Sequence, residues 1–246
     1  MGRQRRISRA KEIEQALLEK LDELRDQKGQ LPSEAEITRL FDTSRVTVRE
    51  ALSSLEQKGL IVRKHGIGTF VNDKVRAIQA RLNESIEFGS LIRISGYQAE
   101  VELTNWHCGP ASPETASRLN IDTGAEVLTT YKTFLADGVP VVYCVNVIPL
   151  SIAVEPLTSL PDEGALRESV YKLLERWFGQ AVAYQIADIE AWGADEMIAH
   201  HLDYPRGGSV LLIEEVAYNL EQQPLFLARE YYRPGVIRFQ LLRKPG

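Results

Sequence analysis

The first sixty residues alternate between short apolar patterns with helical spacing and clusters of polar residues. In the first pattern one residue in three or four is apolar, which is the periodicity of a helix with one buried face: Ile13, Leu17, Leu21 and Leu24. Ser8 precedes the pattern as an expected N-cap, and Lys28-Gly29 follows it as a basic last turn with a terminal glycine. We therefore expect a helix from Ser8 to Lys28-Gly29.

Two shorter helices are predicted next. Ser33 and Glu36 have the spacing of a capping box, in which each side chain satisfies a backbone N–H group of the other, so a helix should begin there. A third helix should begin near Ser44 and close at Lys58-Gly59. Its buried stripe should consist of Val48, Leu52 and Leu55.

A pair of short strands is predicted after the third helix. Residues 61–64 and 69–71 favour strands, and the glycine-containing stretch 65–68 favours a turn between them. Three short helices followed by a basic hairpin are the parts of a winged helix-turn-helix.

The rest of the chain contains a weak internal repeat. Residues 116–128 and 199–211, eighty-three positions apart, each read as a short helix, a glycine turn and a strand, and a hairpin turn follows each copy. Helical spacing is also present from Leu166 to Phe178. Strands in hairpins with helices between them predict an antiparallel α+β sheet domain. The polar stretch 73–79 reads as a linker, so we expect domains at 1–73 and 81–246, joined by residues 74–80.

Composition is consistent with this two-domain organisation. The 246 residues are 44% hydrophobic and 26% charged, which is typical of globular proteins. No apolar run approaches the roughly 20 residues needed to span a bilayer, and the basic N-terminus lacks the apolar core of a secretory signal. The only cysteines are Cys108 and Cys144, too few for a disulfide framework. These features predict a cytoplasmic protein without a membrane partner, whose mature form begins near Met1.

Charge is distributed unevenly between the two predicted domains. Residues 1–76 contain 16 Lys and Arg against 12 Asp and Glu, whereas residues 77–246 contain 13 against 22, so a net charge of +4 is followed by one of −9. This asymmetry indicates a protein that meets a polyanion at one end.

The N-terminal region resembles the DNA-binding domain of the GntR family of bacterial regulators. The resemblance is carried by Leu31-Pro32-Ser33-Glu34, by residues 44–52, by Gly59-Leu60-Ile61 and by residues 66–71, in the family's order and at its spacing. It implies a winged helix-turn-helix whose third helix enters the major groove of operator DNA. The residues expected to contact DNA are Ser33, Ser44, Arg45, Thr47, Arg49, Arg63, Lys64, His65, Gly66 and Gly68.

The chemistry of these residues agrees with the resemblance. Arg45 and Arg49 should project from one side of the third helix, away from its apolar stripe, where an Arg can pair bidentately with guanine. Ser33 stands at a helix N-terminus, which suits phosphate. In the wing, the two glycines should let the backbone approach DNA, while the basic residues supply charge.

The C-terminal region is similar to the UTRA domain of the HutC branch of the GntR family. The similarity covers roughly residues 80–242 and implies a chorismate-lyase-like fold that binds a small effector and contributes to a homodimer. The residues that correspond to family effector positions are Phe88, Ser90, Arg93, Gly96, Lys132, Cys144, Glu190, Phe226 and Tyr232.

Two of these positions depart from the family pattern. Cys144 and Phe226 stand where the family often has a glutamate. Losing both carboxylates predicts a more apolar pocket that disfavours amino sugars, although Arg93 and Lys132 could still hold an anion. Sugar phosphates, nucleosides, amino-acid breakdown products and phosphonates all remain open as effectors.

Other functions are less well supported. No nucleophile–base set appears, so we expect no catalytic residues, and nothing indicates a cofactor. His200 and His201 are adjacent on an expected helix and point in different directions, which argues against a shared metal. We therefore expect a repressor that an effector releases from its operator; an effector-dependent activator and a DNA-binding protein without a ligand stay open as alternatives.

Overall fold

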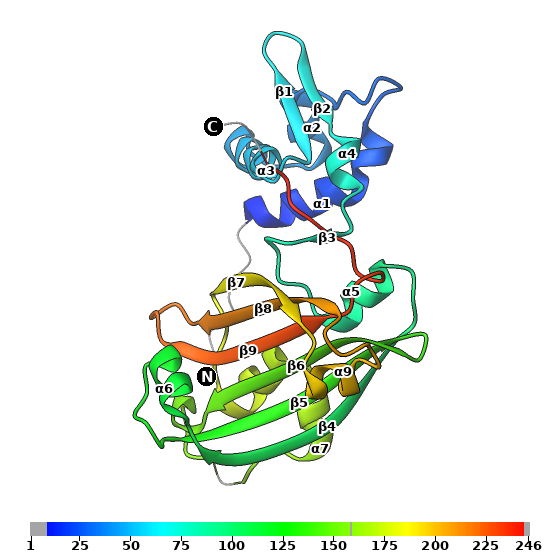
Figure 1. Ribbon diagram of the computed structural model, residues 1–246. Helices are drawn as coiled ribbons and strands as arrows, with labels where there is room; N and C mark the ends of the chain where they lie inside the picture. The colour runs from blue at the N-terminus through cyan, green and yellow to red at the C-terminus, as the bar shows by residue number, and fades with distance from the viewer. Residues whose placement is uncertain (1–8, 158, 244–246) are drawn as a thin grey trace. The chain divides into compact units, whose positions relative to one another are not determined.

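The computed structural model describes residues 9–157 and 159–243 (Figure 1). The chain forms two compact units. The first contains the chain up to Arg81 together with the segment from Gln240 onwards, and the second runs from Leu82 to Phe239.

The N-terminal unit is a three-helix cluster with a two-stranded wing (Figure 1). Its helices are α1 (Arg9–Leu24), α2 (Glu34–Leu40) and α3 (Arg45–Gln57), and its wing pairs β1 (Ile61–Lys64) with β2 (Gly68–Val71). The predicted apolar stripes of α1 and α3 meet in one core, which also contains Leu31, Ile37 and Ile61. The predicted capping box is present, and Ser44 caps α3 as expected.

The end of α1 differs from the prediction. The helix ends at Leu24 and not at Lys28-Gly29. Asp26 Oδ1 accepts hydrogen bonds from the backbone N–H groups of Lys28 and Gln30, both at 2.8 Å, and so favours a turn over another helical turn. Ser8, the expected N-cap, lies outside the described residues.

The segment predicted to be a linker is folded. It forms α4 (Asp73–Arg76), whose Val75 is buried, and reaches β3 (Ala80–Arg81). Arg76 binds Asp22 with both Nη atoms, at 2.9 and 2.7 Å. The guanidinium of Arg81 donates to the carbonyls of Lys58 and Val75. The chain returns to this unit near its C-terminal end, where β10 (Phe239–Gln240) pairs with β3.

The second unit is built on one antiparallel sheet of six strands in the order β4-β5-β6-β9-β8-β7. The strands are β4 (Ala99–Pro110), β5 (Glu126–Ala136), β6 (Val139–Pro149), β7 (Tyr184–Gly193), β8 (Ser209–Tyr218) and β9 (Pro224–Tyr232). β6 and β9 are the central pair; β5 and β4 lie beyond β6, and β8 and β7 lie beyond β9.

The predicted internal repeat corresponds to these two halves. α6 (Pro113–Leu119) connects β4 to β5, and α9 (Glu196–His201) connects β7 to β8. Asn120 and Asp203, eighty-three positions apart, both adopt the left-handed conformation, with φ of 50° and 44°. The predicted hairpin turns are also present, between β5 and β6 and between β8 and β9.

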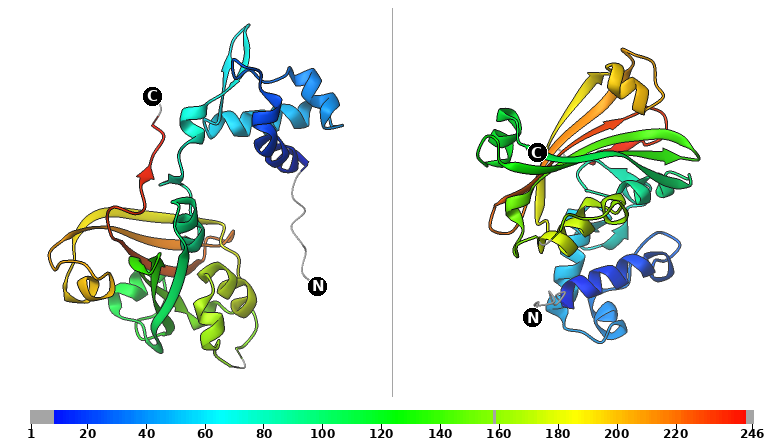
Figure 2. Two further views of the ribbon diagram at one scale, coloured as in Figure 1. Left: turned by 90° about the vertical axis from the view of Figure 1, so that its right-hand side faces the viewer. Right: turned by 90° about the horizontal axis from the view of Figure 1, so that it is seen from below.

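Helices cover the sheet on both faces, as Figure 2 shows. The face with Lys132, Cys144 and Glu230, here called the inner face, packs against α5 (Phe88–Ile94), α7 (Glu163–Arg167), α8 (Val170–Leu173) and a π-helical turn, η2 (Leu174–Phe178). The opposite face, called the outer face, has Tyr143, Leu212 and Tyr231 against α9. A short turn, η1 (Leu150–Ile152), follows β6.

The helix expected from Leu166 to Phe178 is interrupted. Glu168 is extended, with φ −63° and ψ 170°, and Ser169 starts α8 by accepting a hydrogen bond from the backbone N–H of Lys172. The interruption leaves the carbonyl of Glu168 outside any helix, where the Lys132 ammonium reaches it at 2.5 Å.

Candidate DNA interface and effector site

The N-terminal end of α3 presents polar side chains to solvent. Ser44, Arg45 and Arg49 are exposed there, whereas Val48 is buried in the core. Ser44 Oγ accepts a hydrogen bond from the backbone N–H of Thr47 and lies 2.8 Å from Thr47 Oγ1. The two hydroxyls thus hold the first turn of α3 in place while remaining at its surface.

Arg49 has a partner that the sequence pattern did not indicate. Its Nε donates to Glu34 Oε2 at 2.8 Å, and the Glu34 carboxylate raises the pKa of the guanidinium. Arg63 Nη2 also lies 3.9 Å from Glu34 Oε1. The Glu34 carboxylate therefore lies between Arg49 of α3 and Arg63 of the wing. A DNA phosphate that binds these arginines would have to compete with it.

Ser33, at the start of α2, is engaged in its own capping box. Its hydroxyl donates to Glu36 Oε2 at 2.7 Å, and these hydrogen bonds lower the pKa of the Glu36 carboxyl. The side chain is exposed, so it remains placed at a surface that phosphate could approach.

The wing carries the predicted basic residues on exposed positions. Arg63, Lys64 and His65 are exposed, and Lys64 Nζ lies 4.6 Å from the ring centroid of Phe70. Gly66 and Gly68 have φ of 69° and 140°, which favour glycine. At Gly68 a Cβ would also lie 2.4 Å from Gln30 Nε2, so this glycine has a structural role besides any approach to DNA.

Two exposed apolar residues were missed by the sequence reasoning. Val46, in the first turn of α3, is 66% exposed, and Ile67, at the tip of the wing, is 64% exposed. Apolar side chains at such places can contact thymine methyl groups. The sequence contains a signal for both, because each is an apolar residue among non-apolar neighbours in a segment predicted to lie at the surface.

Four of the predicted effector residues come together on or against the inner face. Lys132 and Cys144 are direct cross-strand partners on β5 and β6, and Cys144 is in turn paired with Glu230 on β9. Tyr232 follows on the same strand and face. The ring of Phe88, from α5, lies 4.4 Å from that of Phe134 and 6.2 Å from that of Tyr232.

Lys132 is an unusual lysine because it is almost fully buried. Only 2% of its surface is exposed, and burial lowers the pKa of its ammonium to about 8. Its partner is the Glu168 carbonyl that the interrupted helix leaves available. A buried ammonium of this kind is well placed to meet an acidic or polar ligand group.

The sequence predicted an apolar pocket, but two buried carboxylates lie on the same face as Cys144. Glu230 lies directly beside Cys144, and Glu215 follows on β8; the two are 8% and 9% exposed. Burial raises the pKa of Glu215 to about 7, and burial together with Glu215 raises that of Glu230 to about 8. The family position occupied by Cys144 has lost its carboxylate, but neighbouring strands supply two others.

Further polar residues connect to these carboxylates. Tyr232 Oη donates to Glu230 Oε2 at 2.5 Å, and Gln185 Nε2 donates to Glu215 Oε1. Tyr171 Oη donates to Gln185 Oε1 at 3.1 Å and lies 2.5 Å from Ser85 Oγ. Sequence reasoning missed Glu215, Glu230, Gln185 and Tyr171, although a charged residue inside each of the apolar strands β8 and β9 was a signal for the first two.

The other predicted effector residues lie apart from this cluster or inside the core. Phe226 is a core residue whose ring meets that of Tyr171 edge-on, with the ring centroids 6.3 Å apart. Cys144, which belongs to the cluster, is fully buried, and this burial raises the pKa of its thiol. Arg93 is exposed and donates to Ser90 Oγ at 3.4 Å, and Gly96 closes α5 with φ of 96°.

Glu190 is not brought together with the others. It is exposed on β7 opposite Leu212, which places it on the outer face, whereas Lys132 and Tyr232 belong to the inner face. The alternation of side chains along a strand separates it from the cluster.

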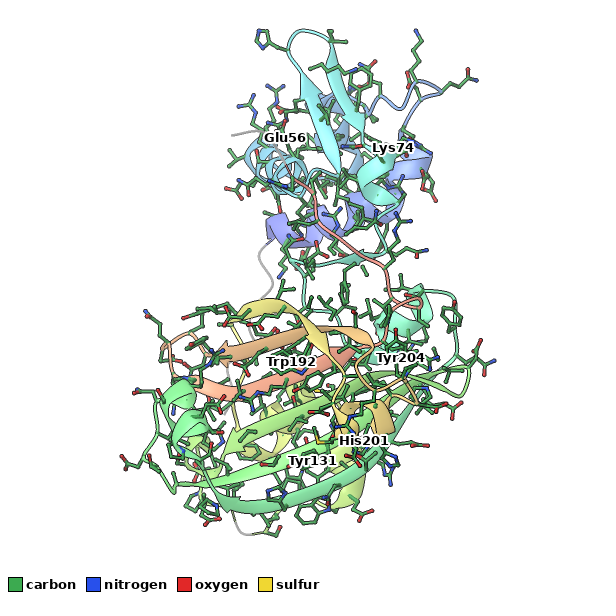
Figure 3. All side chains as sticks on the ribbon, viewed as in Figure 1. Glu56, Lys74, Tyr131, Trp192, His201 and Tyr204 are labelled. Atoms are coloured by element: carbon green, nitrogen blue, oxygen red, sulfur yellow. The ribbon has the colours of Figure 1, made fainter. Side chains whose placement is uncertain are left out.

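The two adjacent histidines belong to an aromatic group on the outer face. His201 stacks on Tyr143 with ring centroids 4.2 Å apart, next to Tyr204 and Tyr131 (Figure 3). Burial and His200 lower the pKa of His201. Within residues 9–157 and 159–243 no group of three or more His, Cys, Asp or Glu side chains could hold a metal ion. In the same part of the chain no helix has the length and apolar character to cross a membrane.

A winged helix with an exposed recognition helix, followed by a separate sheet domain with buried polar groups, defines a DNA-binding transcriptional regulator. Comparison with known families agrees. Residues 9–71 match the family described as "Bacterial regulatory proteins, gntR family", and residues 95–237 match the UTRA domain. The chain belongs to the GntR family, with a UTRA domain as its second unit.

Curated relatives are regulators of transcription. The chain is 30% identical over 216 residues to the HTH-type transcriptional regulator Rv0792c of Mycobacterium tuberculosis, covering 87% of this chain and 77% of that protein. It is 29% identical over 203 residues to the HTH-type transcriptional repressor NagR of Bacillus subtilis, covering 82% of this chain and 81% of that one.

Solved structures show the same fold. The possible transcriptional regulator YydK of Bacillus subtilis superposes with a TM-score of 0.77 at 18% identity, covering 97% of this chain and 100% of that one. PhnF of Mycobacterium smegmatis superposes with a TM-score of 0.58 at 24% identity, covering 95% and 100%.

Proposed function

We propose that this regulator is a repressor that binds operator DNA through α3 and the wing and is released by a small effector bound at the inner face of the UTRA domain. The observation that carries the proposal is the exposed N-terminal end of α3, with Arg45 and Arg49, in the same chain as the buried polar cluster around Lys132, Glu230 and Tyr232. Related proteins are named as repressors, including the HTH-type transcriptional repressor NagR and the "Probable fructoselysine utilization operon transcriptional repressor" of Escherichia coli.

DNA recognition would require two copies of the chain. One winged helix reads a short half-site, and a homodimer with two-fold symmetry would read a palindromic operator at a fixed spacing. Effector binding would then favour a separation of the two heads that no longer matches the half-sites. This assigns repression to the DNA-bound state and derepression to the effector-bound state.

The test begins with an operator selected from genomic fragments by binding to the full chain. Thermal melting against a metabolite library then identifies compounds that bind the folded protein, because such ligands raise the melting midpoint. Each compound is added to the protein–operator complex, and fluorescence anisotropy measures DNA release. The proposal expects at least one stabilising compound to release the operator. If the compound instead raises the affinity of the protein for its operator, release by the effector is contradicted. An effector-dependent activator then replaces the proposed repressor.

A further inference from the structure

The chain passes between its two units at two points. Within residues 9–157 and 159–243 it leaves the first unit after Arg81 and returns to it at Gln240, so the UTRA unit is an insertion into the DNA-binding unit. Residues 81–85 are here called the first connection and residues 239–242 the second connection. A single flexible connection acts as a tether that leaves the orientation of a domain free, whereas two connections restrict its rotation.

Both connections contact the same turn of the DNA-binding unit. Lys58 is the C-cap of α3, and Gly59 follows it with φ of 73°. In the first connection Arg81, which is 8% exposed, donates from Nη1 to the Lys58 carbonyl at 3.0 Å. In the second connection Leu242 packs so closely on Gly59 that a Cβ there would overlap Leu242 Cδ2. The two connections therefore converge on the C-terminal end of the recognition helix.

Both connections also contact the polar cluster on the inner face of the UTRA sheet. In the first connection Ser85 Oγ lies 2.5 Å from Tyr171 Oη. In the second connection the ring of Phe239 stands edge-on to that of Tyr232, with the ring centroids 4.9 Å apart. The two tyrosines belong to the hydrogen-bonded group that contains the buried carboxylates. Each connection is thus attached at one end to the candidate effector site and at the other to α3.

The covalent chain between these attachments is short. Three residues separate Arg81 from Ser85, and two separate Phe239 from Leu242. Segments of this length cannot absorb a displacement at one end without passing part of it to the other, because a few residues supply few free backbone dihedrals.

We propose that the two connections transmit effector binding to the recognition helix, and that Ser85 and Leu242 are positioning residues for this coupling. The proposal rests on the proposed function, because it assigns the route by which the inner-face site acts on operator DNA. A ligand that moves Tyr171 or Tyr232 moves the connection beside it, and the short segment passes the shift to the end of α3. The population of chains whose recognition helix is oriented for the operator then changes.

The first experiment needs no effector, because the operator duplex selected by the full chain serves as the probe. Hydrogen exchange of the full chain is measured by mass spectrometry with and without this duplex. Coupling between two sites is reciprocal, so operator bound at α3 should also act on the UTRA ends of the connections. In the unmodified chain we expect slower exchange at residues 45–60 and changed exchange at residues 82–88 and 233–239.

The double variant S85A/L242A removes one contact from each connection. Its exchange should change only in the first unit when operator binds. The matched variant S209A/L241A removes an exposed serine and an exposed leucine and should behave like the unmodified chain.

Two results overturn the proposal: exchange that changes only in the first unit of the unmodified chain, or changes in S85A/L242A that match those of the unmodified chain. If L242A weakens the DNA-binding unit so that operator binding is lost, S85A/F239L is compared in the same way, because both of its substitutions lie in the UTRA unit.

A second experiment measures the coupling itself. Each compound that stabilises the full chain in the melting screen is added to operator complexes, at a concentration that saturates the melting shift of the variant under test. Without compound, operator affinity should agree within about twofold among the unmodified chain and both double variants, because no substituted residue is assigned to DNA. With compound, it should fall by about 5- to 150-fold in the unmodified chain and in S209A/L241A, and by less than about twofold in S85A/L242A.

The outcomes separate this proposal from the proposed function. Release of operator from S85A/L242A to the same extent as from the unmodified chain overturns the coupling route and leaves the proposed function standing. If no stabilising compound releases operator from the unmodified chain, the proposed function fails. The exchange experiment then still decides whether the connections transmit operator binding to the UTRA unit.

Discussion

At the scale of single residues, the charged side chains of interest are those at the start of α3 and those buried in the sheet of the second unit. Arg45 and Arg49 are exposed at the N-terminal end of α3, and Arg49 donates a hydrogen bond to Glu34. Glu215 and Glu230 are buried, and within the described residues neither forms an ion pair with a Lys or Arg. These arrangements lead to three predictions.

Arg45→Ala should remove operator selectivity and leave the fold intact, because the side chain is exposed. A bidentate contact to guanine contributes about 1–3 kcal/mol of discrimination. Fluorescence anisotropy with operator and scrambled DNA should show the two affinities converging. Arg206→Ala, which removes a 78% exposed arginine from the other unit, should keep its selectivity. If Arg45→Ala keeps its selectivity, the assignment of α3 to the DNA interface is contradicted.

Glu34→Gln should strengthen binding to any DNA sequence. The carboxylate competes with phosphate for Arg49 and lies near Arg63, and its removal eliminates one negative charge at the predicted interface. Affinity for scrambled DNA should rise severalfold at low salt and less at high salt. A decrease in affinity would show that Glu34 positions Arg49 for DNA and does not compete with it.

Stability of the UTRA unit should fall as the pH rises from about 5 to 8. The folded-state pKa values of Glu215 and Glu230, about 7 and 8, lie above the usual 4.5, so the stability these protons contribute is present at low pH and is lost as the pH rises through the folded values. The slope is at most about 1.4 kcal/mol per pH unit for each group. Lys132, with its pKa lowered to about 8, acts in the opposite direction above that pH.

The difference between the unmodified chain and E215Q/E230Q isolates this effect. Chemical denaturation across the pH range should give a shallower dependence for the variant. Parallel curves would mean that the two carboxylates ionise normally in the folded protein.

At the scale of elements, the start of α3 combines a structural role with an expected DNA contact. Ser44 caps the helix through the backbone N–H of Thr47 while its side chain faces solvent. The two roles require different chemistry. A helix cap can be any short side chain that accepts a hydrogen bond, charged or neutral, whereas a negative charge at this position would repel the DNA phosphates.

Ser44→Ala and Ser44→Asp should therefore separate the two roles. The alanine variant should lose about 1 kcal/mol of unfolding free energy, and the aspartate variant should retain it because Asp is also a good cap. In DNA binding the aspartate variant should be the weaker of the two. Urea denaturation and anisotropy measure the two quantities. If the aspartate variant binds operator as well as the unmodified chain, Ser44 does not face DNA.

At the scale of the whole molecule, the elements were predictable where periodicity and local capping determine them. The core of the winged helix followed from the spacing of residues such as Leu17, Val48 and Leu52, and the two halves of the sheet followed from the repeat at eighty-three residues. Segment ends were harder, because Asp26 ends α1 through hydrogen bonds that compete with the helix, and Val75 and Arg76 fold the expected linker through distant partners.

The candidate effector site was only partly predictable for a similar reason. Lys132 and Tyr232 were found by resemblance, and the structure places them on one face. The proximity of Glu215 and Glu230 depends on which strands become neighbours in the sheet. Glu190 was grouped with residues of the other face, because the strand register that determines its face cannot be read from the sequence.

The most direct test of the central claim is the affinity of the full chain for its operator, measured by anisotropy with and without a compound that stabilises the protein. Coupling between two sites is reciprocal, so operator affinity and effector affinity must change by the same factor. We predict that the effector weakens operator binding by about 5- to 150-fold, and that operator DNA weakens effector binding equally. Operator and effector that bind together without mutual effect would contradict the account.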